Sequence, residues 1–328
     1  MSGPWYSILT PSDRAGAVAM IQVEHPSMPE IGLPEVGTHQ LRHVDLFGLD
    51  DGVVLGVDER AAVLMPHGGI AIVRQICSAL EERGVPPRSH VDPVVLYPEA
   101  RSEIEAWCSH ALARCASPMG VDVLLEQNKR WAASGCSTVE DAEGVGDENA
   151  RLDRLLHPPL VVAVGRANVG KSSLLNALVG QRVALVADRA GTTRDHVGVP
   201  VDLGGLVVRW IDMPGVDERI EDQEEIGIAL RVIEHADLVV HCIDAVNDEG
   251  VLDPRISGAC PVGIPLLRVG TRADLADHGC VLDARVSVAR DRLGVADMVE
   301  KARDSLIHPA DVRGDALWRF WSSLGPQA

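Results

Sequence analysis

The stretch LVVAVGRANVGKSSLLNALVG, residues 160–180, decides the fold. It opens with a continuous apolar run, which is typical of a parallel strand buried on both faces. The next eight residues, GRANVGKS from Gly165 to Ser172, match the phosphate-loop pattern Gly-x4-Gly-Lys-Ser, and SSLLNALVG has helical character. A strand before the loop and a helix after it are the context that this motif requires. The sequence therefore predicts an α/β P-loop domain that binds a nucleotide.

Backbone and side chains of the phosphate loop have different predicted roles. Backbone N–H groups of the loop and of the helix N-terminus can surround phosphates. Lys171 would place a cation on the β- and γ-phosphates, and the Ser172 hydroxyl would ligate Mg²⁺. The alternative is a glycine-rich turn that matches by chance, which the flanking strand and helix disfavour. The predicted nucleotide contacts in this segment are Gly165, Asn168, Val169, Gly170, Lys171, Ser172 and Ser173.

Three more apolar runs follow the phosphate loop: LVVRWI (206–211), DLVVHCI (237–243) and IPLLRV (264–269). Helical stretches lie between most of the runs, and this alternation is the pattern of a doubly wound sheet. We place this domain at residues 157–310. The segments that follow the runs carry the remaining candidate site residues.

The loop AGTTRD (190–195), between the first two runs, carries two threonines. A threonine on such a loop can reach Mg²⁺ when a γ-phosphate holds the loop closed. We assign Thr193 to Mg²⁺ and to catalysis, and Gly191 and Thr192 to the nucleotide. By themselves, two adjacent threonines in a loop usually belong to an ordinary turn. Its place before an Asp-x-x-Gly is the chain order of a switch GTPase.

That Asp-x-x-Gly lies in IDMPGV (211–216). The Asp212 carboxylate would hold Mg²⁺ through a water, and the Gly215 N–H would meet the γ-phosphate. An ordinary strand-end turn is the alternative. Val216 can neither orient nor deprotonate a water, so catalytic help is expected from elsewhere. Met213, where threonine is usual, has no explanation in the sequence.

VGTRAD (269–274) is the predicted base-reading segment. Asp274 can accept both the N1–H and the exocyclic amine of guanine, which adenine cannot offer in that geometry, so an ATPase is disfavoured. Thr271 and Arg272 stand where Asn and Lys are usual. Arg272 can still lie against the base, whereas Thr271 is expected to lose an amide contact and to weaken affinity. The last candidate contacts, from the later segment DARVSVA, are Ser287 and Ala289.

The chain before residue 157 is predicted to form two further parts. Residues 1–98 should be a small α+β domain whose strands and helix lie at 17–23, 52–57, 61–65 and 70–85. Residues 99–156 should be a helical linker region with Trp107 and Trp131 in its core. Its acidic stretch, STVEDAEGVGDENARLD, is predicted to be a solvated loop.

Residues 311–328 are predicted to form a C-terminal helix, because Leu317, Trp318 and Trp321 fit one helix face. The chain has 328 residues, enough for two domains or more, and its net charge of −18 argues against a broad grip on nucleic-acid phosphates. Only 3% of the residues are aromatic, so direct nucleic-acid binding by base stacking is not expected.

The remaining composition features concern the compartment. The seven cysteines form no Cys-x-x-Cys pair, which suits reduced thiols. The sequence shows no signal-peptide pattern and no apolar run of membrane-spanning length. We therefore predict a cytoplasmic protein without membrane contact.

Two segments of the chain resemble a known family. GRANVGKSSLLNALVGQRVALVADRAGTTRDHV and IDMPGVDERIEDQEEIGI are similar to the G domain of the bacterial MnmE (TrmE) tRNA-modification GTPases. More faintly, ILTPSDRAGAVAMIQV and LMPHGGIAIVRQI resemble the N-terminal domain of that family, which dimerises and binds a formyl-tetrahydrofolate. The resemblance implies a homodimer formed through the N-terminal domains, the G domains or both. Folate binding is not our expectation, because residues 66–69 fit a plain turn.

The resemblance also implies how GTP is hydrolysed without a switch glutamine. Family members have an apolar residue at the position of Val216 and use K⁺, held partly by a phosphate-loop asparagine that maps to Asn168. A glutamate that positions the attacking water maps to Glu224, with Glu221 and Glu225 as close alternatives. Asn168 and Glu224 are therefore candidate catalytic residues, and Asn168 is a candidate K⁺ ligand.

The sequence after residue 310 departs from the family, because it contains no cysteine, whereas family members have a Cys-containing tail that is used in tRNA modification. We therefore expect a shortened MnmE-like GTPase that hydrolyses GTP to GDP and phosphate as a molecular switch. One alternative is a tRNA wobble-uridine modification GTPase that acts with a partner. Another is a guanine-nucleotide-binding module without turnover, which the unusual Met213 and Thr271 would favour.

Overall fold

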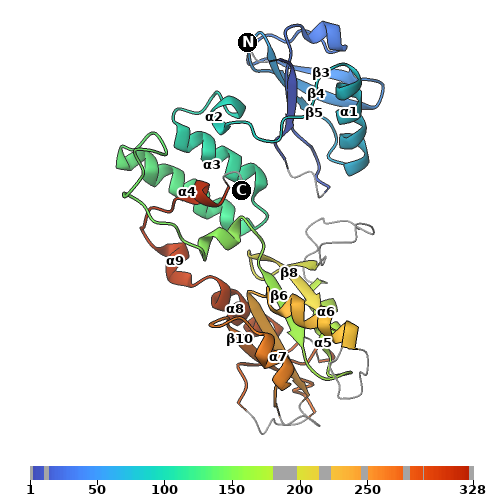
Figure 1. Cartoon of the computed structure of the whole chain (residues 1–328), viewed down its shortest axis with the longest axis vertical. Helices are drawn as coiled ribbons and strands as arrows, with labels where there is room; N and C mark the ends of the chain where they lie inside the picture. The colour runs from blue at the N-terminus through green and yellow to red at the C-terminus, as the bar shows by residue number, and fades with distance from the viewer. Residues whose placement is uncertain are drawn as a thin grey trace.

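The computed structural model describes residues 3–10, 15–179, 198–213, 223–244, 250–275, 281–290 and 292–324. Figure 1 shows an N-terminal sheet with a helix beside it, a helical region in the middle and a second sheet with helices at the other end. The predicted fold class, a P-loop α/β domain preceded by a small α+β domain and a helical segment, is confirmed. No helix in the described ranges is both long and apolar enough to cross a membrane.

The N-terminal sheet is antiparallel and has one face covered by a helix. The N-terminal part contains β1 (Trp5–Ile8), β2 (Ile21–Glu24), η1 (Met28–Ile31), β3 (Leu41–Leu46), β4 (Asp50–Gly56), β5 (Ala61–Met65) and α1 (Ile70–Glu82). The strands are ordered β1-β2-β5-β4-β3 in the sheet. Ile21, Val54 and Leu64 pack with Ile76 and Leu80 of α1 in one buried cluster. Leu64 pairs with both Ile21 and Val54 across the sheet, so these neighbours bury one face against α1.

The segment between β5 and α1 is a turn tied to β4. His67 donates its backbone N–H to Asp50 Oδ2 over 2.7 Å, and its Nδ1 lies 2.8 Å from Asp50 Oδ1. A Cβ on Gly68 would overlap the backbone of Gly16. The close approach of two chain segments explains why glycine follows the histidine.

The middle region is helical, as predicted. It contains α2 (Pro93–Leu96), α3 (Glu103–Arg114), α4 (Pro118–Ser134) and the short η2 (Leu152–Leu155). The Ser102 hydroxyl caps α3 by accepting the N–H of Glu105 over 3.1 Å, and Pro118 opens α4. Trp131 is buried, and Trp107 packs against the same core cluster. Both tryptophans therefore have the core role that we predicted.

Most charged side chains of the acidic stretch after α4 are exposed, as predicted, but a few residues between them tie the stretch to the core. Ala142 is fully buried. Gly146 lies so close to Trp131 that a Cβ there would stand 2.7 Å from the indole ring. Asp153 accepts a hydrogen bond from Trp318 Nε1 over 3.1 Å. Small residues between the charged ones pack this stretch onto the core, and net charge does not reveal them.

Within the described ranges the second sheet has six strands, in the order β11-β10-β9-β6-β8-β7. The strands are β6 (Leu160–Val164), β7 (Val199–Asp202), β8 (Val207–Asp212), β9 (Leu238–Asp244), β10 (Leu266–Thr271) and β11 (Ala284–Arg285). The helices are α5 (Lys171–Val179), α6 (Gln223–Ile233), α7 (Pro254–Ala259) and α8 (Val295–Leu306). All pairs are parallel except the antiparallel pair β7–β8. The carboxyl ends of β6, β9 and β10 therefore meet at one edge, where ligands bind in such sheets.

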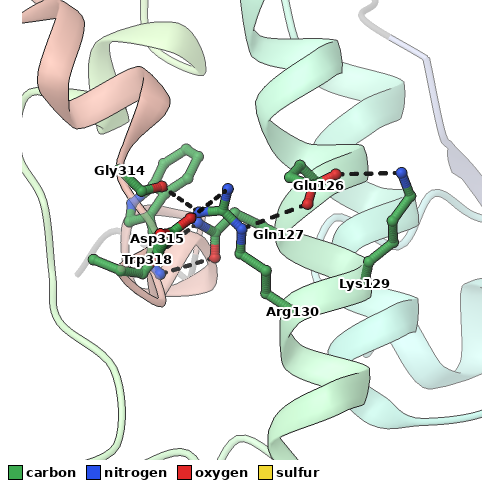
Figure 2. A network of polar contacts seen from close by, with 8 residues as sticks. Glu126, Gln127, Lys129, Arg130, Gly314, Asp315 and Trp318 are labelled. Carbon is green, nitrogen blue, oxygen red and sulfur yellow. Dashed lines mark hydrogen bonds and ion pairs between the residues drawn. The ribbon is translucent and has the colours of Figure 1, made fainter.

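The prediction of a single helix over 311–328 is wrong. The chain there forms α9 (Pro309–Arg313), an extended stretch and η3 (Phe320–Ser323). Buried Gln127 of α4 accounts for the extended stretch: its Nε2 donates to the Ala316 carbonyl over 2.8 Å, and its Oε1 accepts the Trp318 N–H over 2.9 Å (Figure 2). A side chain thus takes the backbone groups that a helix would pair internally.

Candidate nucleotide-binding site

The phosphate loop turns sharply between β6 and α5. Gly165 has a φ of 146° and Gly170 a φ of 107°, values that favour glycine, while Asn168 takes a left-handed φ of 62°. A Cβ on Gly165 would overlap the carbonyl oxygen of Cys242 in β9. The loop therefore rests directly on the neighbouring strand, and only glycine fits at its start.

Lys171 is buried at the start of α5. Its Nζ donates to the carbonyl oxygens of Gly165 over 3.1 Å and of Arg166 over 2.9 Å. Burial lowers the pKa of this amine, and the nearby Asp212 carboxylate opposes the shift. The ammonium group thus lies within the loop, where phosphate oxygens can replace carbonyl oxygens as its acceptors.

Ser172 and Asp212 meet at the position predicted for Mg²⁺. Ser172 Oγ donates to Asp212 Oδ2 over 2.5 Å. Asp212 Oδ1 is buried and has no hydrogen-bond partner among the residues that the structure describes. Hydroxyl and carboxylate oxygens are the ligands that Mg²⁺ prefers, and a buried acceptor without a donor calls for an ion or a water. The donor set therefore fits Mg²⁺ and a metal-bound water.

Thr271 fastens the phosphate loop to the sheet. Its Oγ1 lies 2.6 Å from the Val169 carbonyl oxygen and 3.1 Å from the Ile243 carbonyl oxygen. A hydroxyl has one proton, and the shorter distance assigns the stronger bond to Val169. Thr271 stands where Asn is usual, and its hydroxyl still tethers the loop. We therefore expect a smaller loss of nucleotide affinity than the sequence alone suggested.

Arg272 bridges two elements at the edge of the site. Its Nη1 donates to Asp244 Oδ2 over 2.9 Å, and its Nη2 donates to the Asn168 carbonyl over 2.8 Å. The guanidinium therefore connects the end of β9 with the phosphate loop. The sequence predicted contact of Arg272 with a base but gave no sign of this bridge.

Asp274 and Ser287 come from segments that follow two neighbouring strands. Ser287 is buried, and its Oγ donates to Asp274 Oδ1 over 2.5 Å. This hydrogen bond lowers the pKa of Asp274, and the charge of Arg290 acts in the same direction. An ionised carboxylate with one oxygen fixed in this way can accept the two N–H groups on the edge of guanine.

Most of the predicted residues line one cavity of about 660 Å³, a size that suits a cofactor. Gly165 and Val169 belong to the loop but face the neighbouring strands, and Asp212 is hydrogen-bonded to the cavity-lining Ser172. The predicted residues that line the cavity are Asn168, Gly170, Lys171, Ser172, Ser173, Thr271, Arg272, Asp274, Ser287 and Ala289.

Two segments were predicted to respond to the γ-phosphate, residues 190–195 and the stretch that begins with IDMPGV at residue 211. Both lie largely outside the described residues. Gly191, Thr192, Thr193 and Gly215 lie there, and so do Val216 and Glu221. Glu224 and Glu225 belong to α6, but the structure describes nothing of their side chains. The catalytic roles of Thr193 and Glu224 therefore stay predictions.

The structure explains Met213. Its side chain is buried in a cluster with Val162, Val164 and Val232, and its N–H bonds the Ala163 carbonyl over 3.1 Å. The methionine packs the ends of the strands against α6. It is therefore a core residue, placed directly after β8.

Sequence reasoning missed several residues at this edge. Asp244 is the last residue of β9, beside the strand that leads to the base-reading segment. The rule that ligands bind at the carboxyl ends of parallel strands could have found it. The apolar lining residues, which no sequence pattern separates from core, are Leu174, Leu275, Val286 and Val288.

Comparison with known proteins agrees with this geometry. Residues 160–261 match the family model of the 50S ribosome-binding GTPases. The chain is 40% identical over 169 residues to a tRNA modification GTPase MnmE of Paraburkholderia xenovorans, a match covering 49% of this chain and 36% of the relative. It is 43% identical over 149 residues to the protein of the same name in Cupriavidus metallidurans, covering 42% of this chain and 31% of the relative.

Two solved structures are also similar. The FeoB G domain of Methanococcus jannaschii shares 22% identity at a TM-score of 0.35, covering 45% of this chain and 97% of that one. An Era variant of Aquifex aeolicus bound to GDP and AlF₄⁻ shares 24% identity at a TM-score of 0.34, covering 45% of this chain and 56% of that one. The chain spans about a third of the length of the curated relatives, 36% in the first case. Residues 160–261 lie in a P-loop GTPase domain.

Proposed function

We propose that this chain is a Mg²⁺-dependent GTPase that hydrolyses GTP to GDP and phosphate and acts as a molecular switch. One observation carries the proposal: Lys171 and Ser172 of a phosphate loop line the same cavity as Asp274, the residue that we assign to guanine. The match of residues 160–261 to a GTPase family model supports it.

Asp274 selects the base. Its carboxylate accepts hydrogen bonds from the N1–H and the exocyclic amine of guanine, while Ser287 holds Oδ1 in place. Adenine has an unprotonated N1 on that edge and would leave the carboxylate facing a lone pair. Two hydrogen bonds to a charged acceptor are lost with adenine, so GTP is selected over ATP.

The loop binds the phosphates. Backbone N–H groups after Gly165 and the ammonium of Lys171 would neutralise their charge, and the Ser172 hydroxyl with Asp212 would hold the metal. Mg²⁺ held there would stabilise the negative charge that develops on the phosphates.

Hydrolysis requires a water that attacks the γ-phosphorus while the bond from that phosphorus to the β,γ-bridging oxygen breaks. GDP leaves with the electron pair, and the water's protons pass to phosphate and solvent. We assign the orientation of this water to Glu224. Asn168 is exposed at the cavity, where its amide oxygen can ligate K⁺ and so add a positive charge beside the phosphates.

Nucleotide titration and phosphate release test these roles. Purified protein should bind GDP far more tightly than ADP. It should release phosphate from GTP faster in K⁺ than in Na⁺, and Asn168→Ala should abolish that difference. Equal rates in the two ions would remove the K⁺ role. Tight GDP binding without turnover would favour a binding module.

A second candidate is tRNA modification with a partner, the role for which the similar tRNA modification GTPases MnmE are named. We propose it as a role of the same GTPase. We further propose a homodimer and a cytoplasmic location, as the resemblance and the composition suggest. Isolation of the chain with a bound flavoprotein or folate would support the modification role, and monomeric protein without either would not.

A further inference from the structure

Asp244 and Arg272 form an ion pair beside the nucleotide cavity. Asp244 ends β9, and Arg272 follows β10, the parallel neighbour of β9. The distance from Arg272 Nη1 to Asp244 Oδ2 is 2.9 Å, and only 12% of the Asp244 side chain is exposed. A charged hydrogen bond to a largely buried carboxylate fixes the guanidinium in one orientation.

The other end of the same guanidinium holds the phosphate loop. Nη2 of Arg272 donates to the Asn168 carbonyl over 2.8 Å. Asn168 and Arg272 both have left-handed backbones, with φ of 62° and 54°. Residues other than glycine rarely adopt this conformation and keep it only where neighbouring contacts hold it. The bridge therefore supports the loop at a strained position.

We propose that Asp244 is a positioning residue for nucleotide binding: it orients Arg272, and Arg272 in turn holds the phosphate loop at Asn168 and lines the guanine side of the cavity. The inference rests on the proposed guanine-nucleotide function. Asp244 itself does not line the cavity, so it acts through Arg272.

The bridge also gives a reason for arginine at this position. A planar guanidinium has several donors and can bond Asp244 and Asn168 at once through different nitrogens. A lysine has a single nitrogen on a flexible stem and would have to place it between both acceptors. Arg272→Lys, although it restores the residue that is usual in GTPases, should therefore weaken GDP binding.

A double-mutant cycle on GDP affinity tests the proposal. The proteins are the wild type, Asp244→Ala, Arg272→Ala and the double variant, titrated with a fluorescent GDP analogue. Each single variant should bind GDP about tenfold more weakly, the usual effect of losing a charged hydrogen bond. The double variant should bind no more weakly than Arg272→Ala, because the proposed effect of Asp244 on GDP binding runs through Arg272.

Two further variants keep the outcome interpretable. Asp244→Asn retains an acceptor for Nη1 and should restore much of the affinity lost in Asp244→Ala. Asp297→Ala, which breaks an exposed ion pair with Lys301 on α8, should leave GDP affinity unchanged. Thermal unfolding of all variants identifies any that fail to fold.

The results separate this inference from the proposed function. Wild-type protein that binds no guanine nucleotide would overturn both. Wild-type binding with an unaffected Asp244→Ala would overturn the inference alone. An equal loss from Asp244→Ala with and without Arg272, together with a lower unfolding temperature, would make Asp244 a structural residue and would also overturn it.

Discussion

Ser287 Oγ donates a hydrogen bond to Oδ1 of Asp274 over 2.5 Å, across 13 residues of sequence. Asp274 follows β10, and Ser287 follows β11, so the bond joins two loops at the carboxyl edge of the sheet. It occupies one oxygen of the carboxylate and orients the other. We propose that this pair gives the nucleotide cavity its preference for guanine.

Asp274→Asn should change the base that the protein accepts. An asparagine amide cannot accept both N–H groups of guanine, but it can donate to the 2-oxo group of xanthine. GDP affinity should fall about a hundredfold and XDP affinity should rise, since two hydrogen bonds to a charged group are lost. Competition titrations with GDP, XDP and ADP measure this. Unchanged preference for GDP would show that another residue reads the base.

Ser287→Ala should make GDP binding more sensitive to acid. The Ser287 hydrogen bond lowers the pKa of Asp274. The wild-type carboxylate therefore stays ionised at pH values below the ordinary aspartate pKa of about 3.9. Without that bond the pKa rises toward the ordinary value, and GDP binding should be lost at a higher pH as acidity increases. GDP titrations between pH 6 and pH 3.5 measure the midpoint. Ser305→Ala on α8, which removes a hydroxyl bond to a helix carbonyl, is the matched control.

Gln127→Ala should destabilise the whole chain. It leaves the Ala316 carbonyl and the buried Trp318 N–H without their partner, at a cost of about 2–4 kcal/mol in the free energy of unfolding. Lys129→Ala, on the same helix, removes only an exposed ion pair with Glu126 (Figure 2) and should cost less than about 0.5 kcal/mol. Urea unfolding of both variants compares them. Equal effects would mean that the C-terminal segment does not depend on Gln127.

These contacts also show where sequence reasoning stops. The phosphate loop and the central strands β6, β8, β9 and β10 were predicted because apolar runs and glycine spacing are local signals. The extended C-terminal stretch was not, because its cause is Gln127, nearly two hundred residues away in sequence. The tether at Thr271 and the bridge at Arg272 were missed for the same reason: both depend on which carbonyl the fold brings close.

His110 should make the stability of the helical region depend on pH. Burial, with a further contribution from Arg114, lowers the pKa of His110 to about 4. The unfolded chain, with a pKa near 6.5, binds a proton first as the pH falls. The stability that neutral His110 contributes is therefore full above about pH 6.5 and is lost progressively toward pH 4, by about 3 kcal/mol.

Replacement of His110 provides the check. His110→Gln should flatten this part of the stability curve between pH 7 and pH 4, whereas His43→Gln, at an exposed position on β3, should leave the curve of the wild type unchanged. Denaturant unfolding at several pH values measures both. The same steepness in His110→Gln as in the wild type would assign the effect to other groups.

The most direct test of the central claim is phosphate release from GTP and from ATP by the purified chain in Mg²⁺ and K⁺, with Lys171→Ala as the matched variant. We predict steady release from GTP, little from ATP, and a loss of at least about a hundredfold in Lys171→Ala, because the ammonium that meets the phosphates is removed. Equal release from GTP and ATP, or GTP turnover that survives Lys171→Ala, would contradict the assignment of this cavity as a GTP-hydrolysing site.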